Sequence, residues 1–419
     1  MEQYRDKDVI VIGAGAAGMM AAITASQQGR RVLLLEKMEQ PGRKLRITGK
    51  GRCNLTNTAN LKDFLSHVGS DSRFMRNSFA LFFNTQLMDF FESHGVPLVV
   101  ERGSRVFPQS GKSLDIFLAL INTIENDPRI DIRKSSPVEK LIMFEGKVNG
   151  VLLKSGEIVH ARKVIVATGG KSYPSTGSTG DGYNLAAMAG HTVLPCHPSL
   201  VPLICEEELP PELIGFTLKN VGLSVTLANG KKVCDHFGEL TFTEDGLGGP
   251  ITLSTSRAVT GLIANNEKLT AHIDLKPAVE ADTLDKRLIS DLNSNGNRLL
   301  HDALRMWLPA ELISLFFIRN KIERYKRLNQ INGNERKLIL RFLKDLALTI
   351  TATHGWEEAI VTQGGVSLKE VNPKTMESKL VPGLYFAGEV LDLDADTGGY
   401  NLQLAFSTGY AAGLGTAQE

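Results

Sequence analysis

Short apolar runs separated by glycine-rich turns mark both ends of this chain. Val9–Ile12 and Val32–Leu35 have the length and unbroken hydrophobicity of strands buried on both faces of a parallel sheet. Small helix-forming residues, Ala21–Ala25, lie between them. Further runs of the same kind occur at Lys163–Ala167 and at the start of Gly383–Gly409. This pattern predicts a Rossmann-like α/β domain whose last strand and helix come from the far end of the chain.

The middle of the chain has a different pattern. Leu61–Pro97 has an apolar helical face, and Val138–His160 alternates like a small hairpin layer. Thr192–Ile273 contains short alternating runs and glycine turns, and Ala281–Ile350 is helical by periodicity. We therefore expect a β-rich and a helical subdomain to interrupt the α/β domain. The expected boundaries are residues 1–190 and 351–419 for the α/β domain, 191–280 for a barrel-like β subdomain and 281–350 for the helical subdomain.

The first turn carries a dinucleotide fingerprint. In "GAGAAG", Gly13 makes the tight turn, Gly15 lets the backbone approach a pyrophosphate, and Gly18 allows close helix–strand packing. The helix that follows offers free N–H groups to phosphates. Glu36 ends the second strand, about 20 residues on, where a carboxylate accepts hydrogen bonds from a ribose. Because FAD and NAD both contain this ribose, the fingerprint alone does not choose between them.

Gly42–Asn57, "GRKLRITGKGRCNLTN", is rich in basic residues and glycine and does not suit a regular helix or strand. Gly388 and Glu389 end the last apolar run, and a glycine turn then opens a helix near Asn401. A helix N-terminus there places free N–H groups and positive dipole where charge can develop on a bound group.

Together these segments resemble the HI0933-like family of FAD-dependent NAD(P)/FAD oxidoreductases. The matching stretches are "GAGAAG", "PGRKLRITGKGRCNLTN", "VIVATGGKSYPSTGSTGDGY", "TQGGV" and "GLYFAGEVLDLDADTGGYN". The resemblance implies bound FAD, with NAD(P)H as a transient electron donor, because the chain has only one dinucleotide fingerprint. It also implies that the basic stretch runs along FAD towards the flavin ring. The expected cofactor-binding residues are Gly13, Gly15, Ala16, Ala17, Gly18, Glu36, Lys37, Gly42, Arg43, Lys44, Thr48, Gly49, Gly51, Arg52, Cys53, Asn54, Val138, Ala167, Thr168, Gly169, Gly170, Asp181, Gly388, Glu389, Gly399, Tyr400 and Asn401.

The resemblance also limits the reaction. The family is associated with reduction of conjugated C=C bonds, in ribosomal RNA uridine or in unsaturated 3-oxo bile-acid intermediates, and one branch with oxidation of aminoacetone. Reducing such a bond requires an oxyanion donor and a proton source beside the flavin. Cys53 and Tyr400 are the candidates, although a buried thiol that only packs is the more ordinary role for Cys53. A non-catalytic FAD-binding protein is the alternative from another class.

Overall composition gives no positive support for several other classes of protein. The net charge of +1, from 47 basic and 46 acidic residues, gives no global field for nucleic acid or membranes. No apolar run is long enough to span a bilayer, and the first strand starts too near Met1 for a signal peptide. The four cysteines form no CxxC pair, so neither a metal site nor a disulfide framework is indicated. We expect a cytoplasmic enzyme of unknown oligomeric state.

One local feature bears on the substrate. Residues 281–350 contain 13 Lys/Arg against 8 Asp/Glu, an excess of five positive charges. Within them, Ile318–Asn329, "IRNKIERYKRLN", could contact RNA phosphates, and Tyr325 could stack on a base. A solvated helix face explains the same charges equally well. The leading hypothesis is therefore a reductase of uridine in large-subunit ribosomal RNA, followed by a reductase of small enones and then an amine oxidase.

Overall fold

The computed structural model describes residues 7–69 and 71–418, which form two compact units. The first unit combines the chain up to Pro198 with the chain from Ala359 onward, and the second comprises Ser199–Glu358. Residues 1–6 and 419, which fall in the expected α/β domain, lie outside the described residues, as does Ser70.

A five-stranded parallel sheet forms the centre of the first unit, in the order β19-β10-β1-β2-β6. Most of its strand residues are apolar and fully buried, as expected for a parallel sheet covered on both faces. The order reverses at β1, which lies between β2 and β10, and such a switch point creates a crevice at the carboxyl ends of the strands. The strands are β1 (Val9–Ile12), β2 (Val32–Leu35), β6 (Ile130–Arg133), β10 (Lys163–Val166) and β19 (Leu384–Phe386).

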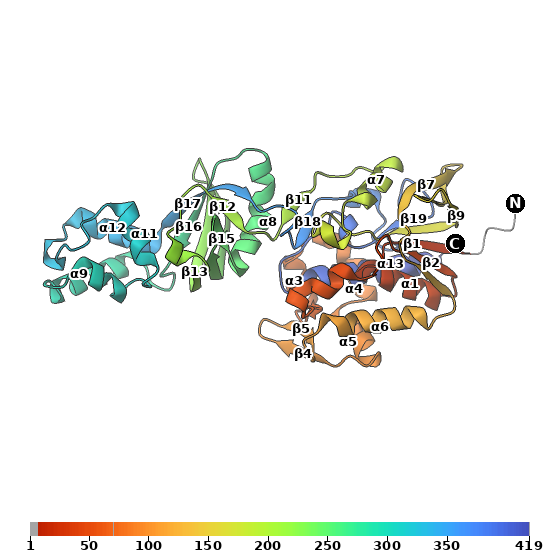
Figure 1. The fold of residues 1–419 in the computed structure, drawn as a ribbon, viewed down its shortest axis with the longest axis horizontal. Helices are drawn as coiled ribbons and strands as arrows, with labels where there is room; N and C mark the ends of the chain where they lie inside the picture. Colours follow the sequence, from red (N-terminus) through yellow and green to blue (C-terminus); the bar gives the residue numbers. More distant parts are fainter. Residues whose placement is uncertain (1–6, 70, 419) are drawn as a thin grey trace. The chain divides into compact units, whose positions relative to one another are not determined.

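Two helices from opposite ends of the chain pack directly against each other beside this sheet (Figure 1). They are α1 (Ala16–Gln27) and α13 (Tyr400–Gly415). Glycines permit the contact: a Cβ added at Gly409 would lie 2.3 Å from Ala17 O, and one at Gly413 would lie 2.7 Å from Ala21 O. The helix after the last strand is therefore fixed against α1, the helix that follows the glycine-rich first turn.

The remaining elements of the first unit surround this core. The antiparallel layer β7-β8-β9 packs on β10, and a second small sheet has the order β3-β5-β4. The bounds are α2 (Arg43–Ile47), β3 (Thr56–Asn57), α3 (Leu61–Ser66), α4 (Arg76–Leu81), α5 (Asn84–Ser93), β4 (Leu98–Glu101), β5 (Arg105–Pro108), α6 (Ser113–Glu125), β7 (Val138–Phe144), β8 (Lys147–Leu153), β9 (Ile158–His160), α7 (Asp181–Met188), β11 (His197–Ser199) and β18 (Val361–Gln363).

The second unit contains a closed barrel in the order β12-β15-β14-β13-β16-β17, together with a group of helices. The barrel and the helices share one buried apolar core. The bounds are β12 (Leu203–Cys205), β13 (Thr217–Leu227), β14 (Lys232–Phe242), β15 (Gly246–Gly248), α8 (Pro250–Ala264), β16 (Leu269–Asp274), α9 (Ala281–Ser294), α10 (Leu300–Ala303), α11 (Leu312–Asn320), α12 (Gly333–Lys344) and β17 (Leu346–Thr353).

Two segments of this unit differ from the expected pattern. Residues 346–350, expected to end the helical segment, begin β17, because alternating Leu, Ile and Thr side chains suit a strand that pairs with both β12 and β16. The β-rich segment also contains the 15-residue helix α8, which begins with Pro250 at its first position.

Candidate functional site

The carboxyl ends of the parallel strands bring the predicted site segments together. The turn at Gly13 follows β1, Glu36 follows β2, Ala167–Gly170 follow β10, and Gly388–Glu389 follow β19. Since parallel strands end at the same edge of a sheet, segments from both ends of the chain meet there. This edge is the candidate site.

The glycines of the first turn differ in how closely other atoms pack against them. Gly13 has φ +101°, and a Cβ there would lie 2.6 Å from Ala167 O. A Cβ at Gly18 would lie 1.8 Å from Gly13 O, so helix and strand touch at this point. At Gly15 an added Cβ would meet no atom within 4 Å, so the backbone there faces open space. Gly15 is thus the position at which a ligand can approach the start of α1.

Glu36 is fixed by two backbone donors. Ala14 N donates to its Oε2 at 2.9 Å, and Met38 N donates to its Oε1 at 2.8 Å. Each carboxylate oxygen has a further lone pair for a ribose hydroxyl. Lys37, the next residue, bonds Asp181 Oδ2 at 2.6 Å and Thr179 Oγ1 at 2.7 Å.

That ion pair changes the acidity of Asp181. Burial alone would raise the pKa of the Asp181 carboxyl, but hydrogen bonds from Lys37 and Thr179, together with the Lys37 charge, lower it overall. The "TGDG" segment is therefore tied, through an ionised aspartate, to the residue beside the expected ribose-binding acid.

A partly buried ionic network connects the basic loop to the last strand. Lys44 Nζ donates to Glu389 Oε2 at 2.7 Å and to Ser172 Oγ at 2.8 Å. Ser172 Oγ and Thr362 N donate to Glu389 Oε1 at 2.6 and 2.8 Å. Burial alone would raise the pKa of Glu389, but the Lys44 ammonium and these donors outweigh it and lower the pKa. Glu389 is an ionised carboxylate at the edge of the sheet.

The loop after α2 has a backbone that few residues adopt. Gly49, Lys50, Gly51 and Cys53 all have positive φ, between +55° and +83°. Two of the four are not glycine, and such strain concentrates at ligand-binding segments. Cys53 N donates to Thr48 O at 3.0 Å, closing the loop.

Cys53 is fully buried, with 0% of its surface exposed. Burial raises the pKa of its thiol to about 12, although a hydrogen bond with Thr48 offsets part of the increase. A fully buried thiol of this acidity stays protonated at neutral pH, which favours packing over proton transfer.

The basic side chains of the loop point in different directions. Arg52 lies 4.4 Å above the Phe107 ring and pairs with Glu101 at 2.5 Å, so its guanidinium contacts the β4–β5 hairpin. Arg43 is exposed at the start of α2. Lys44 is thus the basic residue of this stretch that bonds directly to the last strand's carboxylate.

The N-terminus of α13 borders the same loop. Gly399 is the N-cap residue of this helix and has no side chain that could bond the first N–H groups; its φ is +96°, and a Cβ there would lie 2.3 Å from Thr56 O. With its amide turned to satisfy its neighbours, Asn54 donates to Thr56 O at 3.3 Å and accepts from Gly399 N at 3.0 Å. Asn401 bonds both the N–H and the carbonyl of Ala395, at 2.9 and 2.7 Å. Asn401 therefore orients the preceding loop.

Tyr400 is nearly buried at the first position of this helix. Its ring packs edge-on against Phe64 and stacks on His67. Burial, with the charges of Asp396 and Asp63, raises the pKa of the Tyr400 phenol, which is therefore a neutral hydrogen-bond donor at physiological pH.

The HI0933-like protein Rossmann domain is the family model that matches this chain, over residues 7–415. The chain belongs to the HI0933-like family. It is 32% identical over 412 residues to the 3-dehydro-bile acid delta(4,6)-reductase of Clostridium scindens, covering 97% of this chain and 98% of that protein. It is also 32% identical over 411 residues to the ribosomal RNA dihydrouridine synthase of Escherichia coli K12, covering 98% and 97%. A solved quinol–fumarate reductase with menaquinol molecules shares the fold, with TM-score 0.52, 16% identity, and coverage of 100% of this chain and 71% of that chain.

These findings confirm the family and fold inferred from the motifs. This HI0933-like protein is an FAD-dependent oxidoreductase with a Rossmann-type FAD-binding domain. Its residues fit such a cofactor: the backbone at Gly15 is open to a phosphate, the fixed Glu36 carboxylate can accept hydrogen bonds from a ribose, and the start of α13 presents backbone N–H groups. Within residues 7–69 and 71–418, no helix is long and apolar enough to cross a membrane.

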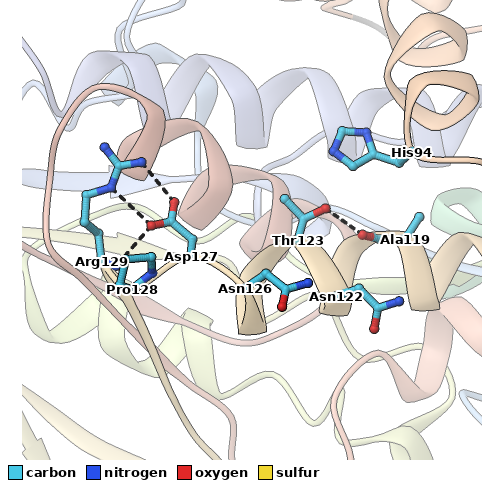
Figure 2. A pocket seen from close by; sticks show the side chains of 8 residues that line it. All are labelled: His94, Ala119, Asn122, Thr123, Asn126, Asp127, Pro128 and Arg129. Atoms are coloured by element: carbon cyan, nitrogen blue, oxygen red, sulfur yellow. Dashed lines mark hydrogen bonds and ion pairs between the residues drawn. The ribbon is translucent and has the colours of Figure 1, made fainter.

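A surface hollow of about 510 Å³ lies elsewhere in the same unit, along the end of α6 (Figure 2). Asp127 and Arg129 in its wall pair with each other, and Thr123 bonds the Ala119 carbonyl. None of its lining residues belongs to the expected cofactor set. This hollow is therefore separate from the candidate site.

The roles of two residues that donate to Glu389 cannot be predicted from the sequence alone. Thr362 lies in the "TQGGV" motif, and Ser172 follows "GGK", so both motifs carried a signal, but no role could be assigned before their contact with Glu389 was known. Val138, an expected cofactor residue, begins β7 opposite Leu153 and is half-buried.

Proposed function

We propose that this HI0933-like protein reduces a C=C bond conjugated to a carbonyl, with NAD(P)H as the electron donor and uridine in large-subunit ribosomal RNA as the leading substrate. The observation behind the proposal is the similarity, at 32% identity over 97–98% of this chain, to two relatives whose names both denote reduction of such a bond. Uridine and a 3-oxo Δ4,6 steroid both place the C=C next to a carbonyl. One mechanism can therefore serve both substrates.

Bound FAD would supply hydride transfer, and the chain would supply binding and polarisation. Gly15 and the start of α1 would hold the pyrophosphate, and Glu36 the adenosine ribose. The Lys44–Glu389 network would hold the middle of the cofactor. Tyr400, with a raised pKa, would donate a hydrogen bond to the substrate carbonyl as negative charge develops on it.

Some of the basic side chains of residues 318–329 are engaged in ion pairs, so fewer of them can contact RNA than their number in the sequence suggests. Arg319 bonds Glu207 and the Ala347 carbonyl, and Lys326 pairs with Glu335 at 2.7 Å. Both are therefore engaged within the second unit. Arg324 and Lys321 remain exposed beside Tyr325, whose side chain is 66% exposed. These three side chains support contact with phosphates and a splayed base.

A small-molecule enone is the second candidate, because the match to the bile-acid reductase equals the match to the RNA enzyme in identity and coverage. Under this alternative, Lys321, Arg324 and Tyr325 would have no part in substrate binding.

Nucleoside mass spectrometry of large-subunit ribosomal RNA, from the source organism with and without this gene, tests the proposal. Loss of dihydrouridine on deletion, restored by the wild-type gene, is the expected result. Complementation with Lys321→Ala/Arg324→Ala/Tyr325→Ala should restore less dihydrouridine than complementation with Lys268→Ala, a control at an exposed lysine of the same unit. Unchanged dihydrouridine in the deletion strain would reject the RNA substrate. Reoxidation of the reduced purified enzyme by a 3-oxo Δ4,6 bile acid would then test the second candidate.

A further inference from the structure

Three side chains form a cluster beside the start of α13. His67 caps the C-terminus of α3, and its Nδ1 lies 2.9 Å from Asp396 Oδ2. The imidazole stacks on Tyr400, with 4.4 Å between ring centroids and 18° between planes. Helix α3 and the loop before α13 are more than 300 residues apart in sequence, so the contact exists only in the folded chain.

Backbone bonds fix this arrangement. Asp396 N donates to His67 O at 2.9 Å, and Gly69 N donates to Asp394 O at 2.8 Å, so the two loops are paired through an antiparallel bridge between Val68 and Ala395, next to His67. Asn401 bonds the Ala395 N–H and carbonyl from the first turn of α13. The ring is therefore held by pairing, stacking and a carboxylate.

This environment suits proton transfer better than that of Cys53. A carboxylate on Nδ1 sets the tautomer of a histidine and stabilises the imidazolium, leaving Nε2 directed to the other side of the ring. The His67 side chain is 42% exposed, whereas Cys53 is fully buried. His67 can therefore exchange protons with solvent, and Cys53 lacks that access.

We propose that His67 is the proton source for C=C reduction and that Asp396 is its positioning residue; this inference rests on the function proposed above. After hydride addition at the carbon β to the carbonyl, the π electron pair forms an enolate whose oxygen accepts a hydrogen bond from Tyr400. Nε2 of the His67 imidazolium gives its proton to the α carbon, the enolate collapses to the ketone or amide carbonyl, and the neutral imidazole regains a proton from solvent. The substrate gains one hydride and one proton, and NAD(P)H is the reductant that supplies the two electrons.

Separate measurement of the two half-reactions tests this role. Flavin absorbance follows reduction of the FAD-loaded protein by NAD(P)H, and then reoxidation by unmodified large-subunit ribosomal RNA or by a 3-oxo Δ4,6 bile acid. His67→Gln keeps a polar side chain beside Asp396 but carries no transferable proton. We expect it to slow reoxidation by roughly 10²–10⁴-fold while leaving reduction and FAD affinity at wild-type values. Asp396→Asn should slow reoxidation less, and added imidazole should partly rescue His67→Ala.

A matched control is His94→Ala, which removes an exposed histidine that packs on Phe90 in the same unit. Thermal unfolding of each apoprotein checks folding independently of activity. Wild-type reoxidation rates in His67→Gln would overturn the proton-source role and leave the proposed function intact. Failure of the wild-type enzyme to be reoxidised by either probe would overturn both. A His67→Ala defect that imidazole does not rescue, together with lost FAD affinity, would assign His67 a structural role instead.

Discussion

Lys44 and Glu389 are 345 positions apart in sequence, yet their side chains form a 2.7 Å ion pair at the edge of the central sheet. Lys44 lies on α2, the next helix after β2, and Glu389 follows the last strand, β19. The side chains are only 23% and 19% exposed, so the pair is weakly screened by solvent. It connects the two parts of the FAD-binding unit that the second unit separates in sequence.

Removing one partner should therefore be more costly than removing both. Lys44→Met leaves the Glu389 carboxylate without its counter-charge in a largely buried site, and we expect a loss of about 2–3 kcal/mol in unfolding free energy. The double variant Lys44→Met/Glu389→Gln should recover part of that loss. Urea unfolding of the four proteins of the cycle measures the coupling.

The exposed pair Lys232–Asp235 is a matched control for this cycle. Its N–O distance is 2.8 Å, close to that of Lys44–Glu389, but both side chains are 59% exposed. Its coupling should be below about 0.5 kcal/mol. Equal coupling for the two pairs would contradict the argument that burial makes the Lys44–Glu389 contact strong.

Alanine substitutions at two glycines of the first turn should have different effects: one should weaken FAD binding, and the other should destabilise the fold. An alanine at Gly15 meets no protein atom and suits the extended backbone there, so the apoprotein should unfold at the wild-type temperature. The methyl group would obstruct the phosphate approach, and losing one charge-assisted hydrogen bond, worth about 1.5–3 kcal/mol, should weaken FAD binding by about 10–100-fold. Calorimetric titration of apoprotein with FAD measures this effect.

Gly18→Ala is the contrasting variant. Its Cβ would lie 1.8 Å from Gly13 O, so helix and strand must separate, and the apoprotein should lose about 1–3 kcal/mol or more. Wild-type FAD affinity in Gly15→Ala would mean that the phosphates do not approach this backbone.

His354 should make the stability of the second unit depend on pH. Its Nδ1 lies 2.6 Å from Glu358 and its Nε2 lies 3.1 Å from Asp245. Burial alone would lower the pKa of His354, but these two carboxylates outweigh it and raise the pKa above 6.5. The folded state thus binds the proton more tightly than the unfolded state. This contribution is complete below pH 6.5 and is lost as pH rises through the folded-state pKa.

Thermal unfolding of wild type and His354→Asn at pH 6 and pH 9 tests this sign. At pH 6 the second unit of the wild type should unfold at a midpoint temperature a few degrees above that of the variant, and this difference in midpoint temperature should be smaller at pH 9. If the difference in unfolding temperature instead increases with pH, the folded state stabilises the neutral imidazole of His354.

The elements that sequence predicts well here are those encoded locally. The buried strands were visible as unbroken apolar runs, and the turn at Gly13–Gly18 and the start of α13 were visible as glycine motifs. The sequence pattern predicts helix over residues 346–350, because apolar residues end a charged helical segment there; this prediction is wrong, since pairing with β12 and β16 makes these residues a strand. Strands β12 and β16, which pair with these residues, lie far from them in sequence, so local sequence patterns do not reveal the pairing.

Contacts between distant side chains could not be derived in this way. Composition identified the excess charge of residues 281–350, but only the fold shows that Arg319 faces Glu207 and Lys326 faces Glu335. The same limit applies to His67, because the residues next to it in sequence do not predict its contacts with Asp396 and Tyr400.

Cys53 provides a test that complements the one for His67. With its pKa raised to about 12 and no exposed surface, its thiol should resist iodoacetamide in the folded protein at pH 8 and react fully in guanidinium chloride. Cys53→Ala should cost about 1–2 kcal/mol through lost packing, yet leave flavin reoxidation by the substrate at the wild-type rate. Peptide mass spectrometry after timed alkylation measures the first effect, and stopped-flow absorbance the second. Rapid native alkylation together with slowed reoxidation in Cys53→Ala would instead place the proton source in the loop after α2, because an accessible thiol there could exchange its proton with solvent.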